Sequence, residues 1–327
     1  MKAVTWRKFG AAQDVLQVEE LPKPSPAAGE VLVRVAFSGA NPSDAKARSG
    51  TRPGVTKPPF EVIVPHSDGA GVIEAVGAGV DAARVGARVW IWNGQWQRPF
   101  GTCAEYVVLP ADQAVTLPET VSLEVGAVLG IPGLTAAQTV FGDGDVTGKV
   151  VLVSGGGGSV GFLAVQLAAW GGATVIATCG ARDMARVKAA GATHVFDYAS
   201  PTLAEDILAV SGGGVDRAVE VELGPNLALL AEVMKPLGTI AAYGSAKDMT
   251  PEMPFGPMLF KALKLDITLI YILPKAARDA AIARLHAALM AGALTFETPN
   301  VFAPDAAGAA HNLVEAGGRK GAVLVAF

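Results

Sequence analysis

Residues 151–161 read VLVSGGGGSVG, and this run carries the clearest structural signal in the chain. A short β-branched segment, Val150–Ser154, ends where four consecutive glycines begin. An apolar segment with helical spacing follows at Ser159–Trp170, and the glycine pair after it provides a C-cap. Further strands and helices alternate beyond this point, which is typical of a parallel sheet with helices on both faces.

The glycines of this run fit the pattern G-x-G-x-x-G at Gly156, Gly158 and Gly161. The pattern alone is a weak signal in a chain with 39 glycines, but here a strand precedes it and a helix follows it. In that setting the early glycines let backbone N–H groups approach a diphosphate, and Gly161 lets the helix pack against the strand. A flexible glycine linker is the alternative, and it predicts neither the strand nor the helix. We therefore predict a dinucleotide-binding loop.

The end of the next strand, after Ile176, indicates which dinucleotide the loop binds. An NAD-binding protein of this fold usually carries Asp or Glu there to hold the ribose 2′-hydroxyl, whereas no carboxylate appears before Asp183. A guanidinium suits the 2′-phosphate of NADPH, because it pairs with phosphate through two hydrogen bonds. Arg182 is the first candidate, followed by Arg186 and Lys188, unless all three lie on a solvated helix face. The pattern favours NADPH over NADH.

The bulk composition narrows the class of protein. A chain of 327 residues is long enough for about two domains, and 51% of its residues are hydrophobic. No apolar run reaches the roughly 18 to 20 residues of a membrane-spanning helix, and Met1–Val4 lacks the apolar core of a secretory signal. The net charge of −4 argues against a nucleic-acid surface. We expect a cytoplasmic protein without membrane or nucleic-acid partners.

The first third of the chain differs from the region after Lys149. It contains short Val-rich strands separated by proline and glycine clusters, which indicates an irregular β domain. The last part of the chain contains one long helix, Ala276–Met290, and a final strand, Ala322–Phe327, that can join the sheet of the first domain. The expected fold class is α/β, with a β domain and a doubly wound parallel-sheet domain.

The sequence offers few groups for metal binding or proton transfer. Neither cysteine has a suitable neighbour, and the four histidines show no metal-ligand spacing, so we predict no bound metal. Candidates for a proton donor or polarising group lie in loops of the first domain, although a lone titratable loop residue is more often solvated than catalytic. These candidates are Asn41, Asp44, Lys46 and His66.

Other residues near the expected domain junction leave two interpretations open. Thr135 stands where the two halves meet, and a Thr there equally serves as a helix cap. An aromatic cluster fits a substrate pocket and a domain core equally well, and it comprises Trp90, Trp92, Trp96 and Phe100.

Four further segments occur in an order that a known family shares. They are residues 39–50 (GANPSDAKARSG), 65–71 (PHSDGAG), 101–106 (GTCAEY) and 132–136 (PGLTA). The family's corresponding motifs are N-P-x-D/E…R-S-G, P-G-S-D-x-A-G, G-T/S-Y/F-A-E-Y and P-G-L-T-A. With the glycine loop, the chain resembles the zinc-independent quinone oxidoreductases nearly from end to end. These are the ζ-crystallin-like branch of the medium-chain dehydrogenase/reductases.

The resemblance implies a GroES-like β domain that the C-terminal segment completes, a Rossmann domain inserted between, NADPH as coenzyme, and a homodimer formed through the Rossmann domain. We expect a GroES-like domain at residues 1–124, a Rossmann domain at 125–268 and the completing segment at 269–327. The resemblance implies diphosphate contacts from Gly157, Gly158, Ser159 and Val160, and adenosine-phosphate contacts from Thr178, Arg182 and Tyr198. It implies that Asn41, Thr135, Gly244 and Ser245 lie near the nicotinamide.

Several residues depart from the family pattern. Lys46 stands where the family often carries Tyr beside the substrate pocket, and a lysine can donate a proton or hold an oxyanion. His66 replaces a glycine at the mouth of the same cleft. Ser67 takes the position of the ligand in the Gly-His-Glu triplet of zinc-binding relatives, and Gly321-Ala322 replaces the family's C-terminal Gly-Lys. These differences leave the substrate open.

We therefore expect NADPH-dependent, zinc-independent hydride transfer to a quinone or similar conjugated carbonyl, with Asn41, Lys46 and His66 as catalytic residues. Asn41 would position the nicotinamide or the substrate carbonyl, and Lys46 or His66 would stabilise developing negative charge. The alternative enzyme reduces the double bond of an enone, alkenal or enoyl thioester. A non-catalytic NADPH-binding protein and a zinc alcohol dehydrogenase are the remaining alternatives.

Overall fold

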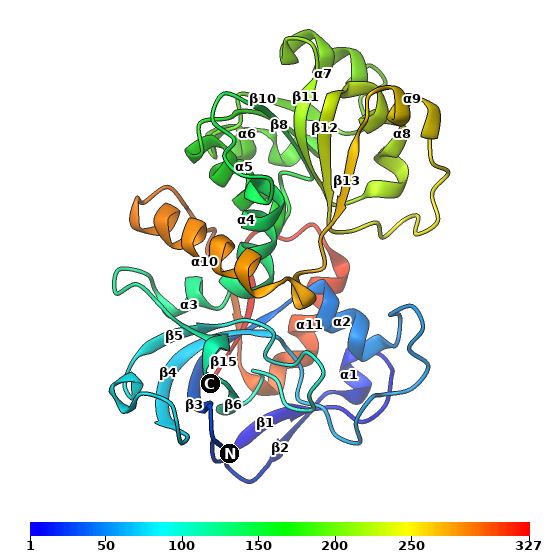
Figure 1. Cartoon of the computed structure of the whole chain (residues 1–327). Coiled ribbons are helices and arrows are strands. Elements are labelled where there is room, and N and C mark those ends of the chain that lie inside the picture. Colours follow the sequence, from blue (N-terminus) through cyan, green and yellow to red (C-terminus); the bar gives the residue numbers. More distant parts are fainter. The chain divides into compact units, whose positions relative to one another are not determined.

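The computed structural model describes residues 1–327, and they form two compact units (Figure 1). The first unit contains residues 1–131 and 296–327, and the second contains residues 132–295. None of the helices has the length and apolar character that crossing a bilayer requires.

A seven-stranded sheet forms the centre of the first unit, with the strand order β14-β15-β3-β4-β5-β7 and with β6 paired to β3. Along β3, Val33 and Val35 are buried while Arg34 between them is exposed, because successive side chains of a strand point to opposite faces. The last strand of the chain, β15, pairs antiparallel with β3 and so completes this sheet.

The strands of the first unit are β1 (Lys2–Thr5), β2 (Gln17–Glu20), β3 (Glu30–Ala40), β4 (Asp68–Val76), β5 (Arg88–Ile91), β6 (Tyr106–Pro110), β7 (Ala114–Thr116), β14 (Asn300–Phe302) and β15 (Val323–Ala326). Its helices are α1 (Ala12–Val15), α2 (Pro42–Ser49), α3 (Leu123–Gly126) and α11 (Ala307–Ala316). A π-helical turn, Leu129–Gly133, runs into the second unit.

Six parallel strands form the sheet of the second unit in the order β10-β9-β8-β11-β12-β13. The chain enters this sheet at β8, and successive strands then extend first to one side and afterwards to the other. In this doubly wound topology, ligands bind at the carboxyl ends of the strands where the order reverses, which here means beside β8.

The strands of the second unit are β8 (Val150–Ser154), β9 (Thr174–Cys179), β10 (His194–Asp197), β11 (Val215–Glu220), β12 (Met234–Ala242) and β13 (Lys264–Ile267). Its helices are α4 (Leu134–Phe141), α5 (Ser159–Trp170), α6 (Met184–Ala189), α7 (Leu203–Ser211), α8 (Leu223–Val233), α9 (Phe255–Phe260) and α10 (Lys275–Met290).

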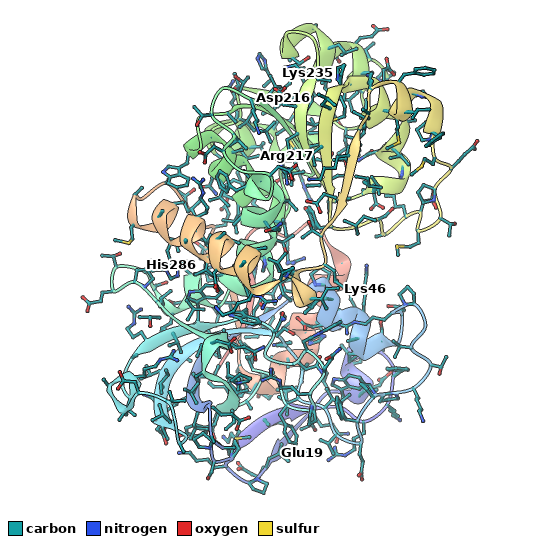
Figure 2. The ribbon with its side chains drawn as sticks, in the orientation of Figure 1. Glu19, Lys46, Asp216, Arg217, Lys235 and His286 are labelled. Carbon is teal, nitrogen blue, oxygen red and sulfur yellow. The ribbon has the colours of Figure 1, made fainter.

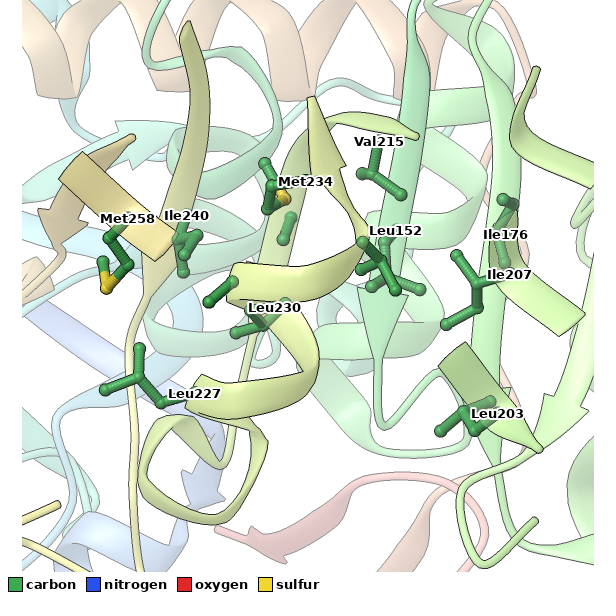
Figure 3. Close-up of a cluster of buried hydrophobic side chains, with 13 residues drawn as sticks. Leu152, Ile176, Leu203, Ile207, Val215, Leu227, Leu230, Met234, Ile240 and Met258 are labelled. Atoms are coloured by element: carbon green, nitrogen blue, oxygen red, sulfur yellow. The ribbon is translucent and has the colours of Figure 1, made fainter. Parts of the chain in front are cut away.

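The core of the second unit contains side chains of the sheet, α7 and α8 (Figure 3). The sheet contributes Leu152 and Ile240, and α7 contributes Ile207, all of them fully buried. Helix α8 contributes Leu227 and Leu230, because residues three apart lie on one face of a helix. This core packs α7 and α8 against the sheet.

The topology confirms the predicted α/β fold class, with a GroES-like β unit and a Rossmann unit. The units nevertheless divide at residues 131/132 and 295/296, whereas we predicted boundaries at 124/125 and 268/269. The second boundary lies later than predicted because α10 packs against α4 of the Rossmann unit, where the guanidinium of Arg284 lies 5.0 Å from the ring centre of Phe141. The final strand is present as β15, but helix α11 before it was not predicted.

Candidate functional site

The glycine turn lies at the carboxyl end of β8, the strand beside which the sheet order reverses. Gly155 adopts the left-handed conformation with φ +68°, which favours glycine. The Gly156 N–H donates to the Thr178 carbonyl at 2.8 Å and so fixes the turn to β9. Gly158 is the N-cap of α5 and has no side chain to cap it. The first N–H groups of α5 are therefore open to a ligand.

Two glycines of the turn are required by close contacts. A Cβ on Gly161 would lie 2.2 Å from the carbonyl oxygen of Gly155, so the helix packs on the turn only with glycine there. A Cβ on Gly157 would lie 2.9 Å from the side chain of Asp183. Ser159 is exposed and Val160 half-buried at the start of α5, so their backbone is accessible. The turn forms an anion-binding cradle with a positive helix end.

The residues that the resemblance assigns to the adenosine phosphate gather beside this cradle, at the carboxyl ends of β9 and β10. Tyr198 is 63% exposed, and its ring atom Cε1 lies 3.6 Å from the point where Gly180 would carry a Cβ. The Arg182 side chain is 64% exposed on the segment that follows Gly180. Thr178 is buried, and its carbonyl supports the glycine turn.

The three cations considered at this end have different roles in the structure. Arg186 donates to the Gly157 carbonyl at 2.6 Å and to Asp183 Oδ1 at 3.0 Å. Lys188 donates to the Thr193 carbonyl. Arg182 uses only its Nε, 3.4 Å from Asp183 Oδ2, and its terminal nitrogens make no hydrogen bond. Arg182 is therefore the cation that is available to a ligand.

A buried carboxylate that the sequence analysis did not single out, Glu220, ends β11 beside the glycine turn. It accepts hydrogen bonds from Ser154 Oγ, the Glu222 N–H and Asn226 Nδ2. Burial raises the pKa of Glu220, while these three donors oppose that rise. Because Ser154 is the last residue of β8, Glu220 fixes the point where the turn leaves the strand. The only sequence signal was an acid at the end of an apolar strand.

Gly244 and Ser245 follow β12 in a turn that packs against β11 and α8. The Gly244 carbonyl accepts from the Leu223 N–H at 3.0 Å, and Ser245 Oγ accepts from the Gly224 N–H at 2.8 Å. The Ser245 hydroxyl in turn donates to the Asp248 carbonyl. Both predicted residues thus lie at the carboxyl end of the sheet, with the Ser245 side chain committed to its own turn.

Thr135 lies in the first turn of α4 and is buried. Its carbonyl accepts a hydrogen bond from Thr139 Oγ1 at 2.7 Å within the same helix. The structure places it just after the π-helical turn that leads into the Rossmann unit.

In the GroES-like unit, Asn41 is held by two buried carboxylates. Its backbone N–H donates to Asp44 Oδ2 at 2.8 Å, and its Nδ2 donates to Asp68 Oδ2 at 2.8 Å. The other oxygen of Asp68 accepts from the Ile131 N–H at 2.8 Å. These contacts fix the orientation of the Asn41 amide, because its Nδ2 donates to Asp68 and its backbone N–H donates to Asp44.

Both carboxyl groups carry raised pKa values. Burial raises the pKa of Asp44 to about 7, although hydrogen bonds from Asn41 and the charge of Arg52 oppose the rise. Burial and the neighbouring Asp44 raise the pKa of Asp68 well above its ordinary value. The pair therefore takes up protons more readily than ordinary aspartates, and like charges close together disfavour double ionisation.

Lys46 is exposed on α2, and its ammonium group makes no hydrogen bond or ion pair (Figure 2). This ammonium group is therefore free to donate a proton to a ligand or to hold an oxyanion, as expected from its departure from the family pattern.

His66 is not at the mouth of a cleft, which corrects that expectation. It is fully buried in the GroES-like unit, with φ +75°, and its ring stacks on His311 with ring centres 5.1 Å apart. Its Nε2 lies 2.9 Å from His311 Nε2, and its Nδ1 lies 2.8 Å from Ser38 Oγ. A side chain with no exposed surface and with both nitrogens paired cannot contact a substrate.

The hydrogen bonds of this cluster run in one direction. The Thr102 hydroxyl donates to the Asp68 carbonyl, so its oxygen accepts from Ser38. Ser38 then accepts from His66 Nδ1–H, and the bare Nε2 of His66 accepts from His311 Nε2–H. Burial and His311 lower the pKa of His66, and burial and the nearby Arg48 lower the pKa of His311 to about 3. Both histidines are neutral.

Two members of the aromatic cluster belong to the core of the first unit. Trp90 and Trp92 are buried, and Trp92 Nε1 donates to the Asp112 carbonyl at 3.2 Å. Trp90 lies on β5, where it pairs with Ala70 of β4. These two tryptophans are core residues, whereas Phe100 is 46% exposed. No group of three His, Cys, Asp or Glu side chains gathers closely enough to hold a metal ion.

Two family models match the chain. The alcohol dehydrogenase GroES-like domain matches residues 27–119, and the zinc-binding dehydrogenase model matches residues 159–286. A GroES-like unit combined with a Rossmann unit defines a medium-chain dehydrogenase/reductase.

Similar proteins indicate which branch of this superfamily the chain belongs to. The chain is 31% identical to rat quinone oxidoreductase over 247 residues, which cover 75% of this chain and 73% of the relative. It is 34% identical to the human synaptic vesicle membrane protein VAT-1 homolog over 247 residues, which cover 74% of this chain but only 60% of that protein. A mycobacterial protein, Rv1454c, solved with NADPH, superposes with a TM-score of 0.84 at 27% identity and full coverage of both chains. The chain belongs to the quinone oxidoreductase branch of the medium-chain dehydrogenase/reductases.

Proposed function

We propose that the protein is an NADPH-dependent oxidoreductase that transfers hydride to a quinone or a similar conjugated carbonyl. The observation that carries this proposal is the glycine cradle at the carboxyl end of β8, where a Cβ on Gly157 or Gly161 would clash and the first N–H groups of α5 are open. Two kinds of relative support it, one named a quinone oxidoreductase and one solved with NADPH.

The residues of the Rossmann unit fit the two ends of the dinucleotide. The backbone of Gly157, Gly158, Ser159 and Val160 holds the diphosphate, and Thr178, Arg182 and Tyr198 surround the adenosine phosphate. Thr135, Gly244 and Ser245 lie toward the nicotinamide, which supplies the hydride when the coenzyme is bound.

The GroES-like unit supplies the polar groups for the acceptor. The hydrogen bond to Asp68 holds the Asn41 amide in one orientation, in which it would position the nicotinamide or the substrate carbonyl. Lys46 stabilises negative charge that develops on the acceptor oxygen, or donates the proton that follows the hydride. His66 has no part in this proposal, because its side chain is fully buried.

The reaction proceeds without zinc. The Asn41 amide and the Asp68 carboxylate bind each other at 2.8 Å, and Ser67 occupies the position that the resemblance assigns to a metal ligand. Amide and hydroxyl groups are not the usual ligands of zinc. Dialysis against a chelator should leave the rate unchanged, and a lost rate that zinc restores would overturn this part of the proposal.

Steady-state oxidation of NADPH with a matched panel of quinones and enones tests the substrate class. We expect turnover with quinones, and we expect Lys46→Ala to lower kcat/KM by at least about tenfold. Lys57→Ala, on a loop of the same unit, is the matched control. Turnover confined to enones would favour the double-bond reductase instead, and no turnover with any acceptor, while NADPH binds, would favour the non-catalytic alternative.

A further inference from the structure

We infer that Asp183 sets how strongly the adenosine end of the coenzyme site prefers a 2′-phosphate over a 2′-hydroxyl. The inference rests on the proposed function, because it concerns the coenzyme that the glycine cradle would hold. Asp183 is the N-cap of α6, and it is only 8% exposed. The missing acid at the end of β9 favoured NADPH, but the fold brings this later acid back to the same place.

The carboxyl group of Asp183 lies directly against the glycine turn. A Cβ on Gly157 would come within 2.9 Å of the Cβ, Cγ and Oδ2 of Asp183, so glycine at this position leaves room for the carboxyl group. Gly157 belongs to the cradle that holds the diphosphate, and the adenosine ribose is joined directly to that diphosphate. Asp183 is therefore placed near the ribose 2′ position, where an acid of this fold accepts a hydroxyl hydrogen bond.

The two arginines that contact Asp183 are not equivalent. Arg186 is nearly buried and is tied to the Gly157 carbonyl at 2.6 Å, to Asp183 at 3.0 Å and to the ring of Phe162 at 4.7 Å. Arg182 meets Asp183 only through Nε at 3.4 Å, and 64% of its side chain is exposed. Arg182 can thus turn its terminal nitrogens to a phosphate while Arg186 keeps the turn in place.

The charges around the 2′ position favour NADPH over NADH only moderately. The charges of Arg182, Arg186 and Asp183 sum to +1, so a 2′-phosphate is attracted by less than two arginines would provide. Asp183 repels that phosphate but accepts a hydrogen bond from the 2′-hydroxyl of NADH. The site accordingly binds both coenzymes, and the carboxylate limits the advantage of NADPH. With an effective dielectric constant of about 40, between those of a protein surface and water, one unit charge about 6 Å away changes binding by about tenfold.

Calorimetric titration with two fragments tests this inference without any turnover. Adenosine 5′-monophosphate and adenosine 2′,5′-bisphosphate differ only in the 2′-phosphate. The Kd of the monophosphate divided by the Kd of the bisphosphate therefore measures the preference for the 2′-phosphate directly. We expect Asp183→Asn, which keeps the shape and one acceptor oxygen, to raise this ratio about tenfold. Asp216→Asn is the matched control, because Asp216 pairs with Lys235 at the opposite, amino-terminal end of β11 (Figure 2). Its ratio should equal that of the wild type.

An increase of less than about threefold in Asp183→Asn would overturn the inference. Arg182→Ala provides a second test, because this exposed side chain can be removed without disturbing the fold, and thermal unfolding verifies that both variants are folded. We expect Arg182→Ala to lower the ratio at least about tenfold, and an unchanged ratio would also overturn the inference. If the wild type binds neither the two fragments nor NADPH, the proposed function itself fails. If the wild type binds the two fragments and Asp183→Asn leaves the ratio of their Kd values unchanged, only the inference fails.

Discussion

At the scale of single residues, the buried pair of His66 and His311 connects pH to stability. Each histidine has a pKa below its ordinary value of 6.5 in the folded protein, whereas the unfolded chain restores that value. The unfolded state therefore binds more protons below pH 6.5, so stability is full above this pH and decreases as the pH falls toward about 3. The raised pKa values of Asp44 and Asp68 act in the opposite direction, because their folded carboxyl groups take up protons first.

We predict that His311→Gln reduces this acid sensitivity. One buried neutral histidine contributes a slope of about 1.4 kcal/mol per pH unit to the free energy of unfolding below pH 6, so the variant should lose that slope relative to the wild type. Urea unfolding between pH 5 and pH 8 measures the difference. His194→Gln, which replaces a histidine outside the pair, is the control. Parallel curves for His311→Gln and the wild type would contradict the account.

We also predict that Asp68→Asn lowers kcat more than it affects binding of the adenosine fragments. Asp68 accepts from two donors, Asn41 Nδ2 and the Ile131 N–H, whereas an asparagine has a single acceptor oxygen. One of the two contacts must therefore be lost, and the Asn41 amide is held less firmly. Hydride-transfer rates and calorimetry with adenosine 2′,5′-bisphosphate separate the two effects. Equal losses in both measurements would indicate general unfolding and not a role in positioning Asn41.

Single residues also show where sequence reasoning ends. The sequence ranked Arg182 ahead of Arg186 and Lys188 but left open that all three lie on a solvated helix face. The structure shows that Arg186 and Lys188 donate to backbone carbonyls, whereas the terminal nitrogens of Arg182 make no hydrogen bond. His66 was misplaced because its partner His311 lies 245 residues away, and no local pattern reveals that the two rings stack. A role that depends on a distant contact is not encoded in neighbouring residues.

At the scale of elements, the junction between the glycine turn and α5 is the part of the fold that was predicted best. Its determinants are local, since a β-branched strand, a run of glycines and an apolar helix lie within residues 150–170. The tail was predicted less well. Helix α10 was expected in the right place in the sequence, but its packing on α4, and so its unit, depends on contacts that the sequence pattern does not show.

We predict that Gly161→Ala damages this junction. The new Cβ would lie 2.2 Å from the Gly155 carbonyl oxygen, so α5 must move away from the turn. We expect a loss of about 1–3 kcal/mol in stability and at least tenfold weaker dinucleotide binding. Gly256→Ala is the matched control, because this glycine lies in α9 of the same unit with nothing within 4 Å of its added Cβ. Similar binding by the two variants would contradict the role given to Gly161.

At the scale of the whole molecule, β13 is an edge strand of the Rossmann sheet, and Ile267 on it is 72% exposed. An exposed apolar edge strand is a ready site for pairing with another chain. We propose that two copies pair through it. Sedimentation should therefore show a dimer for the wild type and a monomer for Ile267→Asp, with Val18→Asp on β2 of the other unit as the control. A monomeric wild type would contradict the proposal.

Hydride transfer by this protein requires above all that the Rossmann unit holds a nicotinamide coenzyme. Calorimetric titration of the wild-type protein with NADPH, with Gly161→Ala measured beside it, tests this claim. We predict saturable binding of one NADPH per chain with a Kd below about 1 mM, and at least about tenfold weaker binding by the variant. The absence of heat with both NADPH and NADH in the folded wild type would contradict the claim.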